Sequence, residues 1–364
     1  MDLKDLSVAV VLGTRPEIIK LAHVIRLLGA AARVVHTGQH YDPGLSGIFF
    51  HAFGLDDPAI RLEIGGRSRG AQIGEAVAAL DTHFEIDRPL VVVVQGDTNT
   101  TMAAAIAANA REIPVVHVEA GLRSHDRAMP EEHNRVVTDH LADLLLAPTD
   151  LARSNLLAEG IPDDRIVVTG NTVVEAVSSL LPSPEQRSEL LDRFGLVPGG
   201  FVLSTFHRPE NVDRPETFAT ILGELAGLGI PVVLPLHPRS RARVEQHGLT
   251  HLLDKLIVVD PVGYQDFLGL LAECAVAVAD SGGVQEEVSV VKRPVVVVRN
   301  STERPEVIGT FAERVVPGPE IGRTVAVWLA DLPAVHRRLS LIPSPYGEGQ
   351  ASEATVTEIV RLVS

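Results

Sequence analysis

The sequence predicts an α/β protein of two Rossmann-like domains, each with a mostly parallel sheet covered by helices on both faces. Short β-branched runs alternate with helical stretches along the chain, which is the pattern of repeated βα units. Residues 91–94 are all valine, as expected of a parallel strand buried on both faces. The alternation breaks near residues 170–200, where Leu181-Pro182-Ser183-Pro184 resembles a connector. We therefore expect two domains with a ligand cleft between them.

Each element is expected from a local signal. Buried strands appear as apolar runs, and the first helix has proline in its first turn, where a missing N–H costs nothing. In the first half we expect strands at Val8–Leu12, Arg33–Thr37, Leu90–Val94, Pro114–Val118, Asp143–Ala147 and Arg165–Thr169, and helices at Pro16–Leu28, Asn99–Ala110 and Pro130–His140. In the second half we expect strands at Phe201–Thr205, Pro231–Leu234, Leu256–Val259, Val276–Ala279 and Pro294–Val298, with helices centred on Phe218–Leu225, Phe267–Leu271 and Val284–Val290. Helically spaced apolar residues predict a last amphipathic helix over Ala351–Val363.

Composition excludes several classes of protein. The chain has 364 residues, of which 45% are apolar and 22% charged, and it contains no apolar run near the roughly 18 residues that a membrane span needs. Its net charge, 32 − 47 = −15, and its 4% aromatic content argue against nucleic-acid binding. The single cysteine, Cys274, excludes an intrachain disulfide and a cysteine-based zinc site. With no signal region at the N-terminus, we expect a cytoplasmic protein.

Polar residues are concentrated just after the expected strands. Ligands of open α/β sheets bind at the carboxyl ends of the strands, so these positions carry the most weight. They are dense in glycine, carboxylate, arginine and histidine, which a purely structural role would not require: Gly13-Thr14-Arg15-Pro16-Glu17, Gly38-Gln39-His40, Gln95-Gly96-Asp97-Thr98, Glu119-Ala120-Gly121-Leu122-Arg123, His207-Arg208-Pro209-Glu210-Asn211, His237-Pro238-Arg239 and Asp280-Ser281-Gly282-Gly283.

The first of these loops does not fit a nicotinamide cofactor. A dinucleotide fingerprint needs G-x-G-x-x-G, but after Gly13 the corresponding positions hold Arg15 and Ile18. A helix N-terminus with Arg15 beside it and Lys20 one turn further suits an anion. The alternative is that both cations are solvated surface charges.

A second candidate anion site follows the strand that ends before Asp280. Gly282 and Gly283 permit close backbone approach at a helix start, and Ser281 adds a hydroxyl donor. Glu287, about a turn inside the helix, could accept from sugar hydroxyls, and Arg304 is a candidate to close over the same phosphate. The alternative is an ordinary helix cap with a glycine turn and acidic first-turn residues.

Three carboxylates and two histidines are candidates for proton transfer. Asp97, Glu119 and Glu131 follow successive elements of the first half, and carboxylates gathered at one rim can supply both an acid and a base. Singly, Asp97 could be a helix cap and Glu131 a favourable first-turn charge. His207 and His237 follow successive strands of the second half and could contact phosphate or move a proton; the alternative is a hydrogen-bonded loop histidine. No H-E-x-x-H or comparable spacing appears, so no catalytic metal is expected.

Together these strings resemble a known family. They are Gly13-Thr14-Arg15-Pro16-Glu17, Thr37-Gly38-Gln39-His40, Gly96-Asp97-Thr98, His117-Val118-Glu119-Ala120-Gly121-Leu122-Arg123, Pro130-Glu131-Glu132-His133-Asn134-Arg135, Gly170-Asn171-Thr172, Asp280 to Glu287 and Thr302-Glu303-Arg304-Pro305-Glu306. In order, over about residues 8 to 316, they are similar to the non-hydrolysing UDP-N-acetylglucosamine 2-epimerases. The resemblance implies the glycosyltransferase-B arrangement, with a first domain at 1–170, a UDP-binding domain at 171–345 and a C-terminal helix within 346–364 packing back on the first. It also implies a homodimer.

The resemblance assigns residue roles. Its catalytic set corresponds to Arg15, Lys20, Asp97, Glu119, Glu131, Arg135 and His207. Its substrate-binding set corresponds to His237, Phe267, Ser281, Gly282, Gly283, Glu287 and Arg304, with Phe267 against the uracil, Glu287 on the ribose, and Ser281, Gly282 and Arg304 on the diphosphate.

The implied reaction is reversible epimerisation of UDP-N-acetylglucosamine to UDP-N-acetylmannosamine through a 2-acetamidoglucal, with no cofactor. No carbonyl neighbours C2, so its proton becomes labile only when UDP leaves C1. Alternatives are a hydrolysing epimerase that releases UDP and free sugar, an epimerase of a modified UDP-sugar such as a diacetamido-uronate, a glycosyltransferase of the same fold, and a non-catalytic UDP-sugar binding protein. The three carboxylates argue against the last.

The chain departs from the family pattern at three places. Pro209 stands after His207-Arg208, and Tyr41-Asp42 follows His40, in segments that help to build an activating UDP-sugar site in many bacterial members. We therefore expect weak or absent activation by substrate. His237-Pro238-Arg239-Ser240 replaces the commoner His-x-Asn-Pro, a variant found in relatives that act on modified sugars.

Overall fold

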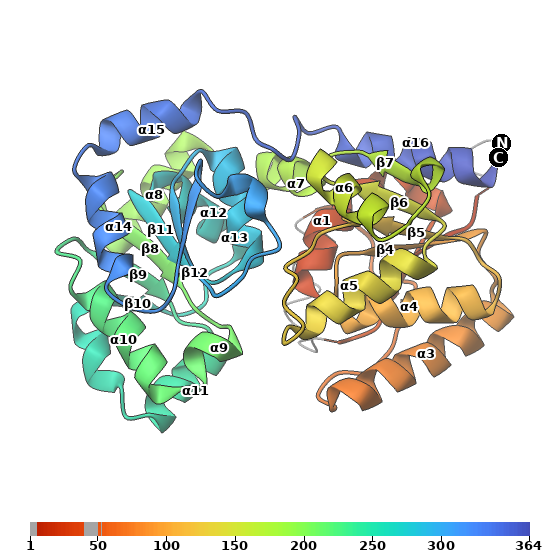
Figure 1. Cartoon of the computed structure of the whole chain (residues 1–364), viewed down its shortest axis with the longest axis horizontal. Coiled ribbons are helices and arrows are strands. Elements are labelled where there is room, and N and C mark those ends of the chain that lie inside the picture. Colours follow the sequence, from red (N-terminus) through yellow and green to blue (C-terminus); the bar gives the residue numbers. More distant parts are fainter. Residues whose placement is uncertain (1–5, 40–49, 52) are drawn as a thin grey trace. The chain divides into compact units, whose positions relative to one another are not determined.

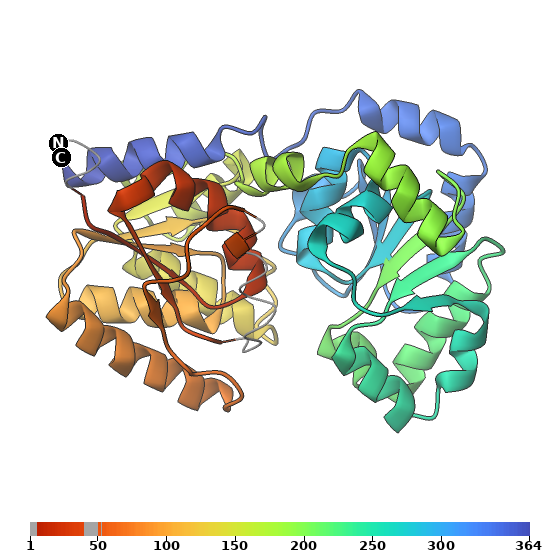
Figure 2. The same ribbon diagram turned by 180° about the vertical axis from the view of Figure 1, so that it is seen from behind.

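The computed structural model describes residues 6–39, 50–51 and 53–364, and these form two compact units (Figures 1 and 2). Unit 1 comprises Met1–Ala176 and Tyr346–Ser364, and unit 2 comprises Val177–Pro345. The division after Ala176 lies inside helix α7 (Val173–Leu180), slightly later in the chain than the expected boundary after residue 170.

Within the described residues, unit 1 contains a seven-stranded, fully parallel sheet in the order β3-β2-β1-β4-β5-β6-β7. Its strands are β1 (Val8–Leu12), β2 (Ala32–His36), β3 (Ile60–Arg61), β4 (Val91–Gln95), β5 (Val115–Val118), β6 (Leu144–Ala147) and β7 (Ile166–Val168). The helices described are α1 (Arg15–Leu28), α3 (Arg69–Ile86), α4 (Asn99–Ala110), α5 (Pro130–Leu141), α6 (Asp150–Ala158), α7 and α16 (Ala351–Val363), with short 3₁₀ turns η2 (Gly29–Ala31) and η3 (Asp163–Arg165).

Chain direction explains which face each helix of unit 1 covers. The sheet grows from β1 toward β2 through α1 and from β4 toward β7 through α4, α5 and α6; right-handed crossovers in opposite directions put these helices on opposite faces. Helix α3 packs along α4, and α16 packs along α1, as both views show. The expected C-terminal helix is therefore present in unit 1, with Val356 and Ile359 on its buried side.

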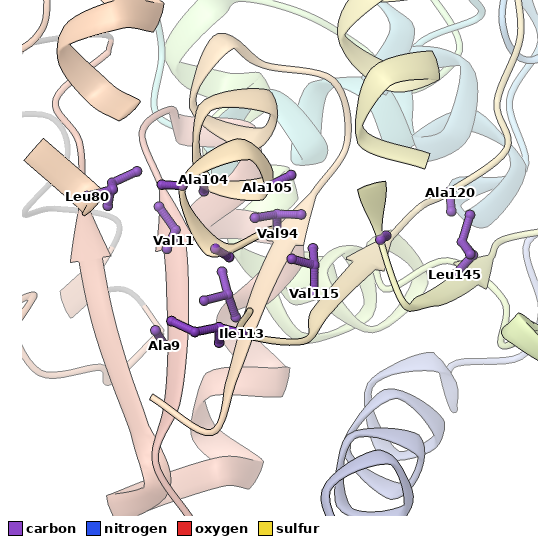
Figure 3. Close-up of a cluster of buried hydrophobic side chains, with 14 of the residues drawn as sticks. Ala9, Val11, Leu80, Val94, Ala104, Ala105, Ile113, Val115, Ala120 and Leu145 are labelled. Atoms are coloured by element: carbon purple, nitrogen blue, oxygen red, sulfur yellow. The ribbon is translucent and has the colours of Figure 1, made fainter. Parts of the chain in front are cut away.

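One hydrophobic core cluster of unit 1 lies between the sheet and the α3–α4 layer. Figure 3 shows valines of β1, β4 and β5 meeting the small side chains of α4, with Leu80 of α3 closing one end. Alanines Ala104 and Ala105 are fully buried, so α4 approaches the sheet closely. The alanine-rich sequence of this helix is thus a packing requirement as well as a helix-forming one.

Unit 2 repeats the architecture with a six-stranded parallel sheet in the order β10-β9-β8-β11-β12-β13, counted over the described chain. The strands are β8 (Val202–Thr205), β9 (Val232–Pro235), β10 (Ile257–Val259), β11 (Val276–Ala279), β12 (Val295–Val298) and β13 (Ala312–Val315). The helices are α8 (Pro184–Phe194), α9 (Pro209–Val212), α10 (Pro215–Ala226), α11 (Pro238–Gln246), α12 (Tyr264–Glu273), α13 (Gly282–Val291), α14 (Glu320–Leu329) and α15 (Leu332–Ser340), with η4 (Thr250–Lys255) and η5 (Pro305–Val307). Helix α10 packs with α14, whereas α12 contacts α8 and α13.

The expected fold class is confirmed, because both halves are parallel sheets flanked by helices. The strands named from the sequence all occur, with ends that differ by at most one residue. Strands β3 and β13 were not among the expected elements.

Candidate active site

The switch points of the two sheets explain where the candidate residues lie. In unit 1, β1 and β4 are neighbours from which the chain leaves in opposite directions, and in unit 2 the corresponding pair is β8 and β11. Such pairs of loops diverge at the carboxyl edge and leave room for a ligand. The loops after these four strands begin at Gly13, Gly96, Phe206 and Asp280.

Asp97 pairs with Arg135 at the carboxyl edge of unit 1. The Arg135 guanidinium, nearly fully buried on α5, donates to Asp97 Oδ2 and to Glu132 Oε2. The interpretation of Asp97 as a helix cap is wrong, because Thr98 is the N-cap of α4 and accepts from the Thr101 N–H. Asp97 therefore has a cation partner and a partly exposed carboxylate instead of a capping role.

The second carboxylate, Glu119, forms an ion pair with Lys20. Both side chains are at least nine-tenths buried, the Lys20 ammonium donates to Glu119 Oε2, and the Asn171 amide donates to the same oxygen over 3.1 Å. Glu119 has a φ of 69°, an unusual backbone conformation for a side chain other than glycine or asparagine. The interpretation of Lys20 as a solvated surface charge is therefore wrong.

Arg15 and Glu131 have different surroundings from this buried pair. Arg15 is exposed at the first position of α1. Glu131 lies half-buried in the first turn of α5, whereas Glu132 next to it is buried and accepts from the backbone N–H groups of Ser124 and His125. Neighbouring residues of a helix point in different directions. Glu132 therefore bonds the Ser124–His125 backbone, whereas Glu131 is only half-buried.

Sequence reasoning assigned no role to Glu17, which links two loops of the site. Its carboxylate accepts from the Gly13 N–H at 3.0 Å and the Thr14 hydroxyl at 2.8 Å, and also from the Thr98 hydroxyl at 2.8 Å. Burial raises the pKa of Glu17 to about 7, although these hydrogen bonds lower it. In the sequence, Glu17 could have been recognised as a candidate from its place at the end of the Gly13–Glu17 string.

In unit 2 the N-terminus of α13 lies against the Arg304 guanidinium. A Cβ added at Gly282 would come within 3.0 Å of Arg304 Nη1 and 2.9 Å of Glu303 Oε1, so a side chain here would have to displace one of these two groups. Arg304 donates to Glu286 Oε1 at 2.7 Å and also pairs with Glu303. Ser281 occupies the N-cap position without a side-chain capping bond, and the first turn holds no acid. These last two observations contradict the ordinary-cap interpretation.

His207 is held by Asp280, which is fully buried. Asp280 accepts from the backbone N–H groups of His207 and Arg208 and from the Asn211 amide. Its Oδ1 lies 3.2 Å from His207 Nδ1. Burial opposes ionisation of Asp280, but His207 and these donors bring its pKa below the usual value.

The other predicted binding residues of unit 2 occupy separate local settings. His237 is exposed and caps α11, its Nδ1 accepting from the Arg239 N–H, and its ring lies 6.0 Å from that of His207. Phe267 is half-buried in the first turn of α12. Glu287 is buried and accepts from the Tyr264 hydroxyl at 2.9 Å, and a Cβ at Gly283 would make only ordinary contact with it.

The side chains described include no group of three or more His, Cys, Asp and Glu that could hold a metal ion. No described helix is long and apolar enough to cross a membrane.

Fold and site together define a two-domain α/β protein with carboxylate–cation pairs in one domain and, in the other, a helix N-terminus that lies against an arginine side chain. The model of the UDP-N-acetylglucosamine 2-epimerase family matches residues 28–360. A relative of that name from Methanocaldococcus jannaschii is 40% identical over 323 residues, covering 85% of this chain and 88% of the relative. The chain therefore belongs to the UDP-N-acetylglucosamine 2-epimerase family, which confirms the resemblance drawn from its motifs.

Two further similarities extend this result. The crystal structure of the Methanocaldococcus jannaschii UDP-GlcNAc 2-epimerase in complex with UDP-GlcNAc and UDP matches with a TM-score of 0.87 at 37% identity, covering 98% of this chain and 100% of that one. A Pseudomonas aeruginosa UDP-2,3-diacetamido-2,3-dideoxy-D-glucuronate 2-epimerase is 35% identical over 367 residues, covering 98% of this chain and all of the relative.

Proposed function

We propose that this protein catalyses the reversible 2-epimerisation of UDP-N-acetylglucosamine to UDP-N-acetylmannosamine without net hydrolysis. The observation that carries the proposal is the pair of carboxylates, Asp97 and Glu119, that follow adjacent strands β4 and β5, each bonded to a buried cation. Epimerisation needs one group to take a proton from C2 and another to return one to the opposite side. Family membership supplies the substrate class.

The chemistry proceeds by elimination and re-addition. The C1–O bond to UDP breaks and UDP leaves with the bonding electrons, while a carboxylate of unit 1 takes the C2 proton and a C1–C2 double bond forms. Re-addition of UDP and protonation of C2 from the opposite face give the other epimer. We assign proton transfer to Asp97, Glu119 and Glu131, with His207 and Arg15 acting where charge develops on the leaving group.

Arg135 and Lys20 fix the two paired carboxylates. An anchored carboxylate points its remaining lone pairs in one direction, which proton transfer over hydrogen-bond distance requires. Because the guanidinium of Arg135 is itself held by Glu132, Asp97 is oriented through a chain of two ion pairs.

We assign UDP to unit 2. The N–H groups at the start of α13 and the Arg304 guanidinium offer donors to a diphosphate, with Ser281, Gly282 and Gly283 allowing close approach. Phe267 would stack on the uracil, Glu287 would accept from ribose hydroxyls, and His237 would contact the nucleotide.

The decisive experiment is incubation with UDP-N-acetylglucosamine in D2O, followed by NMR and mass spectrometry. We expect deuterium at C2 of both epimers and little free UDP. Stoichiometric release of UDP with free N-acetylmannosamine would establish the hydrolysing reaction instead. Turnover without label at C2 would exclude the elimination mechanism, and transfer of the sugar to an acceptor would identify a glycosyltransferase.

A UDP-diacetamido-uronate is the second candidate substrate, favoured by the Pseudomonas aeruginosa relative of similar length. The His237-Pro238-Arg239-Ser240 segment supports it: Arg239 is anchored by Asp213 at 2.7 Å, and Ser240 donates to the Phe206 carbonyl. Comparing kcat/KM for the two UDP-sugars decides between them.

We further propose weak or absent activation by substrate, because Pro209 begins α9 at a position where the family often has a second arginine or a similar residue. Tyr41 and Asp42, the other departure, lie outside the described residues. A sigmoidal dependence of rate on substrate concentration would contradict this proposal.

We also propose that the protein is a cytoplasmic homodimer. The family resemblance supports a dimer, and the buried, free Cys274 is compatible with a reducing compartment. Light scattering after size-exclusion chromatography measures the oligomeric state, and cell fractionation measures the location.

A further inference from the structure

A buried histidine links the loops that carry the two paired carboxylates. His117 lies on β5, two residues before Glu119, and its side chain is completely buried. Its Nδ1 is 2.6 Å from Asp139 Oδ1, and its Nε2 is 2.8 Å from the carbonyl oxygen of Gly96, the residue before Asp97. Asp139, also completely buried, lies on α5.

Both ring nitrogens of His117 are hydrogen-bonded. A carbonyl oxygen can only accept, so Nε2 donates to Gly96. The other nitrogen, Nδ1, bonds to Asp139 Oδ1. Asp139 Oδ2 accepts from the Gly121 N–H at 3.2 Å and pairs with Arg123 at 2.7 Å. Burial alone would raise the pKa of Asp139, but His117 and Arg123 bring it below its usual value.

The cluster extends from Asp139 through Arg123 to a second carboxylate. Arg123 also donates to both oxygens of Glu159, at 2.7 and 2.6 Å. The Arg123 guanidinium thus joins two carboxylates, Asp139 and Glu159, and Asp139 lies between it and His117. A buried cluster whose members are all hydrogen-bonded can remain rigid inside a protein.

Both ends of the cluster hold backbone with positive φ. Gly96 has a φ of 71°, and Glu119 and Gly121 have φ values of 69° and 83°. For Glu119 this conformation is strained and persists because the surroundings impose it. His117 fixes the carbonyl group of Gly96, which precedes Asp97. Asp139 fixes the N–H group of Gly121, two residues after Glu119.

We propose that His117 and Asp139 are positioning residues for the epimerisation, fixing the spacing of the Asp97 and Glu119 loops from inside the protein. The proposal rests on the proposed function. Neither residue needs to touch substrate, so their loss should lower kcat with little change in KM. Misplacement of a reacting group by about 1 Å can cost roughly 100-fold in rate.

Two substitutions separate the two contacts of His117. An asparagine amide nitrogen replaces Nδ1 and keeps the bond to Asp139, whereas a glutamine amide nitrogen replaces Nε2 and keeps the bond to the Gly96 carbonyl. We expect H117N to lower kcat by roughly 10- to 100-fold with KM changed less than about threefold, and H117Q to retain more of kcat. His83→Asn on α3 is the matched control and should keep the wild-type kcat.

Activity is normalised to folded protein by counting UDP-binding sites calorimetrically, since the assigned UDP residues lie in unit 2. Wild-type kcat per site in H117N would overturn the proposal. If neither variant folds, D139N is tested instead. We expect it to have a lower kcat than the wild type and unchanged UDP binding. Failure of all three to fold would assign the pair to folding and also overturn it. Wild-type protein that binds UDP without epimerising either sugar would refute the proposed function instead.

Discussion

Asp280 and His207 form a unit in which one buried carboxylate fixes both the backbone and the ring of a partly exposed histidine. The carboxylate oxygens receive the His207 N–H at 3.2 Å, and Oδ1 lies 3.2 Å from Nδ1 of the same residue. A ring held at Nδ1 presents Nε2 in a fixed direction, which a proton donor or a phosphate ligand requires.

We predict that Asp280→Asn lowers kcat by about tenfold while UDP still binds. In every contact named above, the Asp280 carboxylate accepts a hydrogen bond. Asparagine replaces one carboxylate oxygen by an NH2 group, so one of these donors would then face another donor. Steady-state kinetics and calorimetric titration with UDP measure the two effects. Asp260→Asn, at a side chain that is 93% exposed in the same unit, is the control. A wild-type kcat in D280N would show that Asp280 is not needed to position His207.

The second prediction concerns the glycine at the start of α13. Gly282→Ala should weaken UDP binding by roughly tenfold, because the new methyl group must displace the Arg304 guanidinium or Glu303. Gly283→Ala is the matched comparison, since its Cβ would lie 3.5 Å from the nearest atom, an ordinary contact. Calorimetry with UDP should therefore give a smaller loss for G283A. An equal affinity for both variants would show that displacement of Arg304 does not matter for the nucleotide.

Sequence alone predicted the strands well, because apolar runs such as Val91–Val94 are buried on both faces and allow few other structures. It missed β13, an edge strand whose central residues, Glu313 and Arg314, are exposed. It missed β3 because two residues carry no periodicity.

At the candidate site, the motifs gave the loops that carry the candidate residues but not the ion pairs that their side chains form. Asp97 and Arg135 come from different motifs, and only the packing of α5 against α4 and β5 brings them together. The same holds for Lys20 and Glu119. Glu131 and Glu132 are chemically alike and adjacent in the sequence, so only their places on the first turn of α5 distinguish the half-buried acid from the buried one.

The third prediction is a pH dependence of stability that originates at Glu17. Its pKa is about 7 in the folded protein against 4.5 for an unperturbed glutamate, so the folded state favours the protonated form. The stabilisation is complete below pH 4.5 and is lost as pH rises through about 7. The loss amounts to about 3 kcal/mol.

Urea unfolding at pH 5 and pH 8 measures this effect. Glu17→Gln should lack this part of the pH dependence, whatever its absolute stability, because glutamine does not ionise. Glu313→Gln, at an exposed strand position, should keep the wild-type dependence. Parallel curves for E17Q and wild type would show that Glu17 does not titrate in this range.

The fourth prediction tests the buried Lys20–Glu119 pair by removing its members singly and together. Lys20→Met leaves the buried Glu119 carboxylate with the Asn171 amide but without its ammonium partner, and should reduce the free energy of unfolding by about 3–5 kcal/mol. The double variant K20M/E119Q removes both charges, so it should be more stable than K20M although it lacks a candidate catalytic group. Arg33→Met breaks an ion pair whose side chains are 50% and 41% exposed, and should cost about 0–1 kcal/mol. If K20M were no more destabilising than R33M, the ammonium would not be compensating a buried charge, and the orientation of Glu119 would have to come from Asn171 and the strained backbone alone.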